Sequence, residues 1–249
     1  MSDPNGSGKT EGASGASTTK DMAHLMAELK QKSIERMSLR LGQRVLDVGC
    51  GTGTSTLALA KIVGVTGVVR GVDYDAAMIT EAQRRARLDG VDSWVFYHQA
   101  NAAALPWPDG SFHASRSDRV LQHMLEPERA FDELVRVTQP GGRVVVIDGD
   151  WATLSIDSDD PDIGARRSYF QETLRPTSPL SGQCLHRLFS RHGLLEIQIN
   201  AQPVFEQCAD VPWCWRQSRT STADADGRFA SANIVMASGR KADAKMSLR

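Results

Sequence analysis

Apolar residues recur along the chain at two different spacings. Short runs of apolar or alternating residues predict β-strands at 44–48, 67–73, 94–98, 113–117 and 143–149. Segments with apolar residues at helical spacing lie at 54–63, 75–88 and 127–138. Strands that alternate with helices form a mostly parallel sheet with helices on both faces. The sequence therefore predicts a doubly wound α/β fold.

A further helix is predicted near the N-terminus. Apolar residues stand at helical spacing between residues 21 and 39: Met22, Leu25, Met26, Leu29 and Met37. In the first interpretation this face packs against the sheet. In the second, Met22 and Met26 belong to a lid over a ligand, since methionine adapts to varied apolar surfaces.

The pattern is less regular beyond Gly149. Helices are predicted near 163–175 and at 181–192, and Gly193 ends the second one. Closing strands at 194–200 and 229–239 bring the expected sheet to seven strands, with an insert at about 204–228. Aromatic residues gather in this part of the chain: Trp151, Tyr169, Phe170, Phe205, Trp213 and Trp215. We expect them to pack in the core or to line an apolar pocket.

The length of 249 residues suits one domain. Residues 1–20 are rich in glycine, serine and threonine, which predicts a disordered tail. We expect a single domain at 21–240, with a ligand-binding core at 44–150 and lid or substrate elements at 151–228. The residues at 241–249 are expected to be frayed.

Composition narrows the functional classes. The net charge of −1 offers no bulk attraction to nucleic acid or to an anionic membrane. No apolar run is long enough to cross a bilayer. The four cysteines form no C-x-x-C pair, which suits a reducing, cytoplasmic location. The oligomeric state stays open.

A glycine-rich loop carries the strongest chemical signal. Asp47, Gly49, Gly51 and Gly53 form a D-x-G-x-G-x-G pattern between a predicted strand and a predicted helix. Glycines let a ligand lie against bare backbone. A dinucleotide site has G-x-G-x-x-G instead, with a pyrophosphate on the helix N-terminus. Because Asp47 would repel a phosphate and attract an ammonium group, an NAD-dependent dehydrogenase is disfavoured.

Three further segments follow in order. Asp73 ends the second predicted strand, 26 residues after Asp47, where a carboxylate accepts hydrogen bonds from ribose hydroxyls. Next comes the segment Ala100 to Phe112, which reads A-N-A-A-A-L-P-W-P-D-G-S-F. The last is V-L-Q-H-M at 120–124, followed by L-V-R-V-T-Q-P-G-G-R at 134–143.

Together these segments resemble the class I S-adenosylmethionine-dependent methyltransferases, and within them the UbiE-like, type 11 small-molecule group. The resemblance covers roughly residues 44 to 150 and implies a Rossmann-like methyltransferase fold with S-adenosylmethionine as cofactor. It implies cofactor contacts from these residues: Asp47, Gly49, Cys50, Gly51, Gly53, Asp73, Tyr74, Asn101, Ala102 and Ser117. Asn101 and His113 stand where the family usually has aspartate. Asn101 is either an uncharged adenine contact or a turn residue.

His123 is the first candidate for a catalytic or substrate-facing residue. It follows the fourth predicted strand, and its pKa suits proton removal near neutral pH. It could equally orient the loop beside the cofactor. Asp148 and Asp150 are alternatives on the same rim. These two acids and the acidic loop at 157–162 could bind a metal, but a solvated loop is favoured and no metal is expected.

The leading hypothesis is methyl transfer to a small apolar or aromatic metabolite. Specialised metabolism is the expected setting. One alternative is an RNA, DNA or protein methyltransferase, although no base-flipping motif and no basic stripe with aromatics is present. Another is a protein that binds the cofactor without transferring its methyl group.

Overall fold

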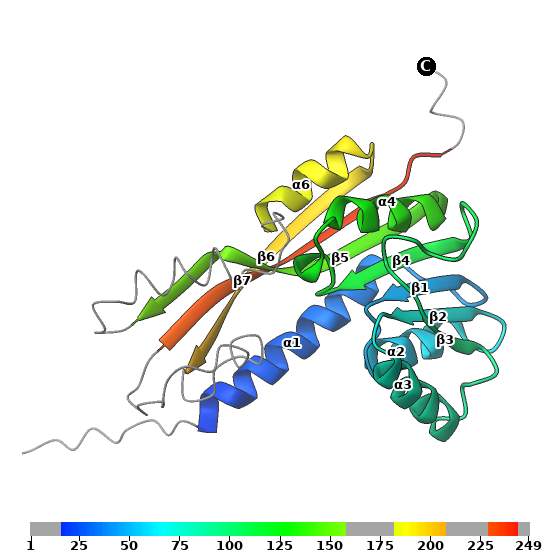
Figure 1. The fold of residues 1–249 in the computed structure, drawn as a ribbon, viewed down its shortest axis with the longest axis horizontal. Coiled ribbons are helices and arrows are strands. Elements are labelled where there is room, and N and C mark those ends of the chain that lie inside the picture. Colours follow the sequence, from blue (N-terminus) through cyan, green and yellow to red (C-terminus); the bar gives the residue numbers. More distant parts are fainter. Residues whose placement is uncertain (1–15, 158–181, 208–228, 244–249) are drawn as a thin grey trace, which may run out of the picture.

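The computed structural model describes residues 16–157, 182–207 and 229–243. Their strands form one seven-stranded sheet in the order β3-β2-β1-β4-β5-β7-β6 (Figure 1). The strands are β1 (Arg44–Val48), β2 (Val68–Asp73), β3 (Val95–Gln99), β4 (Phe112–Asp118), β5 (Thr138–Asp157), β6 (Leu195–Gln207) and β7 (Phe229–Arg240). The strand β7 runs antiparallel to both of its neighbours, β5 and β6, and the other strand pairs are parallel. The predicted mostly parallel, seven-stranded sheet is confirmed.

Helices cover both faces of the sheet, as the alternating pattern predicts. They are α1 (Ala16–Arg36), α2 (Thr54–Val63), α3 (Ala76–Leu88), the 3₁₀ helix η1 (Leu121–His123), α4 (Pro127–Val137) and α6 (Gly182–Arg191). The first three helices contribute to one apolar core, and η1, α4 and α6 contribute to the other. Val45 belongs to the first core and Leu46 to the second, because successive strand residues point to opposite faces.

Local sequence signals explain several helix ends. The Asp75 carboxylate accepts a hydrogen bond from the Ala77 amide at 2.7 Å and so caps the start of α3. Pro127 occupies the first turn of α4. Gly193 follows α6 with a φ of +65°, a left-handed conformation that glycine adopts without strain. The first two features fix where the loops that follow β2 and β4 end, and Gly193 lies in the turn before β6.

Three elements differ from the sequence prediction: α1, β5, and β6, which runs to Gln207 rather than to residue 200. The helix α1 begins at Ala16 rather than at residue 21, and Leu25, Met26 and Leu29 pack in the first core, as the packing interpretation predicts. The strand β5 runs to Asp157 rather than to Gly149, because it pairs with β7 as far as Phe229. A bulge between β4 and β5 takes up the Pro140–Gly142 segment.

Several predictions fall outside the described residues. The predicted helix at 163–175 and the aromatics Tyr169, Phe170, Trp213 and Trp215 are among them. The same holds for most of the predicted tail and for the C-terminal residues 244–249. A lid over the sheet therefore stays a prediction. Within the described ranges, no helix is both long and apolar enough to cross a membrane.

Candidate active site

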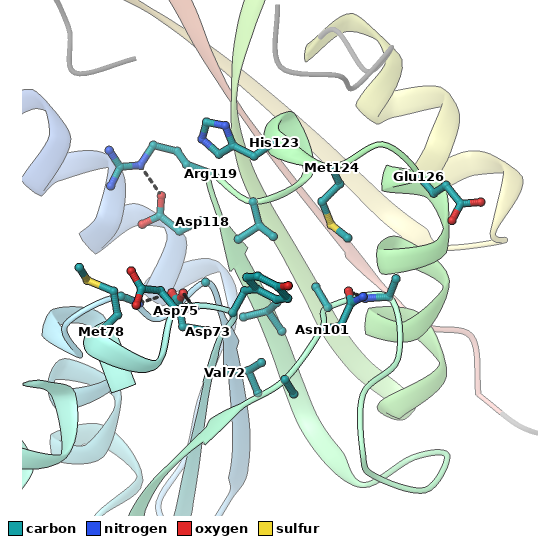
Figure 2. A pocket seen from close by; sticks show the side chains of 18 of the residues that line it. Val72, Asp73, Asp75, Met78, Asn101, Asp118, Arg119, His123, Met124 and Glu126 are labelled. Atoms are coloured by element: carbon teal, nitrogen blue, oxygen red, sulfur yellow. Dashed lines mark hydrogen bonds and ion pairs between the residues drawn. The ribbon is translucent and has the colours of Figure 1, made fainter. Parts of the chain in front are cut away.

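One cleft lies at the carboxyl ends of the parallel strands. It has a volume of about 990 Å³ and is lined by the loops that follow β1, β2, β3 and β4. Ligands in open α/β sheets bind at this edge. Of the residues predicted from the sequence, seven line the cleft: Gly49, Gly51, Asp73, Tyr74, Asn101, Ala102 and His123 (Figure 2). The sheet thus brings together groups that are up to 74 residues apart in the chain.

The three loop glycines have three different surroundings. A Cβ added to Gly51 would meet no atom within 4 Å, so the backbone of Gly51 is open to the cleft. A Cβ at Gly49 would clash with Val120 Cγ2, and one at Gly53 would lie 2.5 Å from the Tyr97 hydroxyl. Gly51 therefore leaves room for a ligand, whereas Gly53 lets the loop pack against β3.

Asp73 is held in place by backbone amides. Its Oδ2 accepts a hydrogen bond from the Gly51 amide at 2.9 Å, and its Oδ1 accepts one from the Asp75 amide at 3.0 Å. An ionised carboxylate has about four acceptor positions. Two of these positions remain for a ligand. The Asp73 carboxylate can therefore accept hydrogen bonds from a pair of hydroxyls while it keeps its hydrogen bonds from the Gly51 and Asp75 amides.

Asn101 and Tyr74 lie in the loops after β3 and β2. The Asn101 Oδ1 accepts a hydrogen bond from the Ala103 amide at 2.9 Å, which is the local turn that the sequence offered as an alternative role. Its side-chain NH₂ group is the donor that this turn leaves for other contacts. Tyr74 is 79% exposed and presents an aromatic ring to the same cleft.

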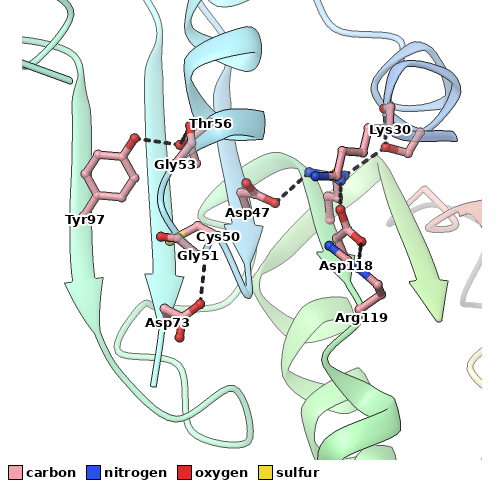
Figure 3. Close-up of polar contacts among 12 residues, drawn as sticks. Lys30, Asp47, Cys50, Gly51, Gly53, Thr56, Asp73, Tyr97, Asp118 and Arg119 are labelled. Carbon is pink, nitrogen blue, oxygen red and sulfur yellow. Dashed lines mark hydrogen bonds and ion pairs between the residues drawn. The ribbon is translucent and has the colours of Figure 1, made fainter. Parts of the chain in front are cut away.

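Asp47 does not line the cleft. Its side chain is buried, and the Arg116 Nη1 donates to its Oδ1 at 3.0 Å (Figure 3). Burial raises the pKa of Asp47 to about 6, against the opposing effect of Arg116. The same guanidinium donates to Asp118 Oδ2 at 2.6 Å and to the Ser33 hydroxyl of α1 at 2.9 Å. The acid of this cluster that lines the cleft is Asp118.

Sequence analysis did not identify this charged cluster. The available signal was an arginine within a predicted buried strand, because a buried guanidinium needs charged or polar partners. Arg116 finds one such partner on each of three elements: Asp47 on β1, Asp118 on β4 and Ser33 on α1. The pairing with α1 spans 83 residues, a distance over which sequence pattern gives no information.

Comparison with known proteins identifies the family of the domain that contains the cleft. A family model described as a methyltransferase domain matches residues 46–146, the segment that forms β1 to β5 and the cleft. Residues 46–146 are a methyltransferase domain of the S-adenosylmethionine-dependent class. The four cleft-lining loops all belong to this domain.

Two curated relatives support the assignment. The ubiquinone/menaquinone biosynthesis C-methyltransferase UbiE of Erwinia tasmaniensis is 38% identical over 119 residues, which cover 48% of this chain and 47% of that protein. The demethylmenaquinone methyltransferase of Anoxybacillus flavithermus is 28% identical over 182 residues, which cover 73% of each chain. The chain thus spans about half the length of the first of these two relatives.

A solved structure shares the fold of the methyltransferase domain. The YcgJ protein of Bacillus subtilis superposes with a TM-score of 0.66 at 22% sequence identity, over 86% of this chain and 98% of that one. This likeness includes the parts of the sheet beyond the family match, so the methyltransferase fold extends to β6 and β7.

His123 lies in η1, at the rim of the methyltransferase cleft. Its Nε2 is 2.9 Å from the side-chain Nε2 of Gln122, whose Oε1 accepts a hydrogen bond from the Gly149 amide at 2.7 Å. Burial and the nearby charge of Arg119 lower the pKa of His123. Its imidazole is therefore favoured in the neutral form near neutral pH.

The two alternative acids have a different position from the one predicted. Asp148 and Asp150 were expected on the same rim as His123, but they lie within β5 and are only 4% and 2% exposed. The reason is that pairing with β7 extends β5 beyond both residues. Burial raises the pKa of Asp148 well above its usual range. Each acid has one carboxylate oxygen without a hydrogen-bond partner.

Three of the remaining predicted residues lie behind the cleft rather than on its surface. Ser117 is buried within β4, Gly53 faces β3, and Cys50 is buried where desolvation raises the pKa of its thiol. Within the described part of the chain, no group of three or more acidic, histidine or cysteine side chains is arranged to hold a metal ion.

Proposed function

We propose that the protein transfers the methyl group of S-adenosylmethionine to a small apolar or aromatic metabolite, in specialised metabolism and in the cytoplasm. The observation that carries this proposal is the cleft in which the bare backbone of Gly51 adjoins the amide-anchored carboxylate of Asp73. A cleft of about 990 Å³ is large enough for a nucleoside cofactor and part of an acceptor.

The described residues fit such a cofactor at named positions. Asp73 would accept hydrogen bonds from the ribose hydroxyls, and Gly49 and Gly51 would border the sulfonium half. Asn101 and Ala102, with Tyr74, would border the adenine. Cys50, Gly53 and Ser117 would support these loops from behind. Asp47 is buried, is paired with Arg116 through its Oδ1 and does not line the cleft, so no direct contact with the cofactor is proposed for it.

The chemistry places modest demands on the protein. The cofactor supplies a methyl group that is already activated for transfer. The residues of the chain have to orient the acceptor and keep water away from the reacting centre. His123 and Met124, which line the cleft at its rim, are the proposed side chains facing the acceptor.

The apolar or aromatic class of acceptor has support from the relatives. Both relatives named above act, according to their names, in quinone biosynthesis, and quinones are apolar ring compounds. The chain's net charge of −1 gives no general attraction to nucleic acid, in keeping with a small-molecule acceptor. The four cysteines of the chain form no C-x-x-C pair, which accords with a cytoplasmic location.

The test is methyl transfer from isotope-labelled S-adenosylmethionine to a panel of quinols, phenols and other apolar metabolites. We expect label in at least one small product, and none with the Gly51→Val variant as a control. Label found instead in RNA or protein would support the macromolecular alternative. Cofactor binding without label in any acceptor class would show a cofactor-binding protein that does not transfer the methyl group.

A further inference from the structure

We propose that Gln122 is a positioning residue that holds His123 as a neutral imidazole with its proton on Nδ1. In this arrangement the Nε2 atom of His123 already accepts a hydrogen bond and is not available to take a proton from the methyl acceptor. The consequence for catalysis rests on the proposed function, whereas the protonation of the ring is a property of the protein alone.

The orientation of the Gln122 amide follows from one backbone contact. The Gly149 amide lies 2.7 Å from the Gln122 side chain, and Gln122 is only 3% exposed. A backbone N–H can donate but cannot accept a hydrogen bond. The side-chain atom that faces Gly149 must therefore be the oxygen, and the other atom of the amide must be the NH₂ group.

The ring protonation of His123 follows from the orientation of Gln122. An amide NH₂ group has donors and no acceptor position, so its contact with His123 Nε2 at 2.9 Å needs a lone pair on that ring nitrogen. A neutral imidazole carries one proton, which must then be on Nδ1. The doubly protonated ring would place two donors against each other.

The charges around η1 favour the same state. Arg119, on the loop before η1, disfavours a second positive charge on the ring and helps burial to lower the pKa of His123. Among the described residues, the acids near this turn include Asp148 of β5, Asp118 of β4 and Glu126, which pairs with Arg129. Asp118 is paired with both Arg116 and Arg119, and burial favours the protonated form of Asp148. These acids therefore supply little negative charge to stabilise a protonated His123.

The consequence concerns the role expected for His123. Its pKa makes it a natural candidate for a general base, but proton removal at Nε2 would first require breaking the bond to Gln122. In this arrangement His123 would instead orient the acceptor at the cleft, which its side chain lines. An acceptor that attacks without losing a proton to Nε2 fits this site best.

The direct test is nuclear magnetic resonance of the full-length protein with ¹⁵N-labelled histidine. The chain has six histidines, so a His123→Phe variant identifies the signals of His123. We expect the wild-type ring to show a protonated Nδ1 and an unprotonated Nε2. In Gln122→Glu one carboxylate oxygen can still accept from Gly149, and the other can accept from the ring. The proton should then move to Nε2, and the pKa of His123 should rise.

Two further variants complete the test. Gln83→Glu makes the same change at an exposed position of α3 and should leave the His123 signals unchanged. Gln122→Met removes the donor without adding charge and should abolish the preference for Nδ1, which covers the case in which Gln122→Glu does not fold. A wild-type ring protonated on Nε2, or a ring unaffected by both Gln122 variants, would overturn the proposal. These readouts need no substrate, so failure to find methyl transfer would leave them intact.

Discussion

The Nη1 of Arg116 lies 3.0 Å from the Oδ1 of Asp47, and the side chains of these two residues are 0% and 1% exposed, respectively. The acid that opens the glycine-rich loop is thus neutralised by the chain itself. From sequence alone, Asp47 was expected to receive the ammonium group of a ligand. The structure instead makes Asp47 part of a buried ion pair that joins β1 to β4 behind the cleft.

Removal of Arg116 should destabilise the protein strongly. Arg116→Met would leave the buried Asp47 without its cation, a change that typically costs about 3–5 kcal/mol of unfolding free energy. The double variant Arg116→Met/Asp47→Asn should recover part of that loss, because no uncompensated charge then remains at Asp47. Urea denaturation measures all three proteins. An exposed control, Arg84→Met, should change stability little, and an equal loss in the single and double variants would contradict the pairing.

The pH dependence of stability should carry a contribution from Asp47. Its pKa is about 6 in the folded protein and close to 4 in the unfolded chain. Between these values the folded state binds more protons, so the unfolding free energy contributed by Asp47 falls as pH rises from about 4 to about 6. Asp47→Asn should lack this contribution. Denaturant titrations at several pH values compare the two proteins, and parallel stability curves would disprove the assignment.

The loop glycines should separate binding from folding. Gly51→Val should fold, at a cost of about 1–2 kcal/mol for its left-handed backbone, and lose cofactor affinity, because the new side chain enters the open cleft. Gly53→Val should lose folding stability instead, since its Cβ would meet Tyr97. Thermal unfolding and cofactor titration together measure both effects. Tight cofactor binding by Gly51→Val would show that the loop does not contact the ligand.

His123→Ala should reduce turnover much more than cofactor affinity. Its ring lies at the rim of the cleft, in η1, and is not among the groups proposed to hold the cofactor. The measurement compares kcat with the dissociation constant of S-adenosylmethionine for both proteins. Equal losses in the two quantities would reduce His123 to a residue that shapes the cofactor site.

The sequence predicted those features that depend on neighbours in the chain. The glycine loop, the acid at the end of β2 and the carboxyl-end position of Asn101 follow from short motifs and from alternating strands and helices. The features that the sequence did not predict depend on contacts between residues far apart in the chain. The end of β5 depends on β7, and the burial of Arg116 depends on Ser33 of α1.

Gln122 shows a further limit of sequence analysis. It lies within the V-L-Q-H-M segment, and nothing in that segment indicates its contact with Gly149 of β5. This contact depends on how η1 packs against β5, which periodicity along the chain does not predict. The general identity of the site was therefore predictable, whereas the protonation state of its histidine was not.

Calorimetric titration with S-adenosylmethionine tests the central claim most directly, with Asp73→Ala as the binding-site variant and Asp92→Ala, exposed in the turn before β3, as the matched control. The account predicts one cofactor per chain, a loss of about 1–3 kcal/mol in Asp73→Ala and no change in Asp92→Ala. A wild-type protein that takes up NADH but not S-adenosylmethionine, or an Asp73→Ala variant with unchanged affinity, would contradict it.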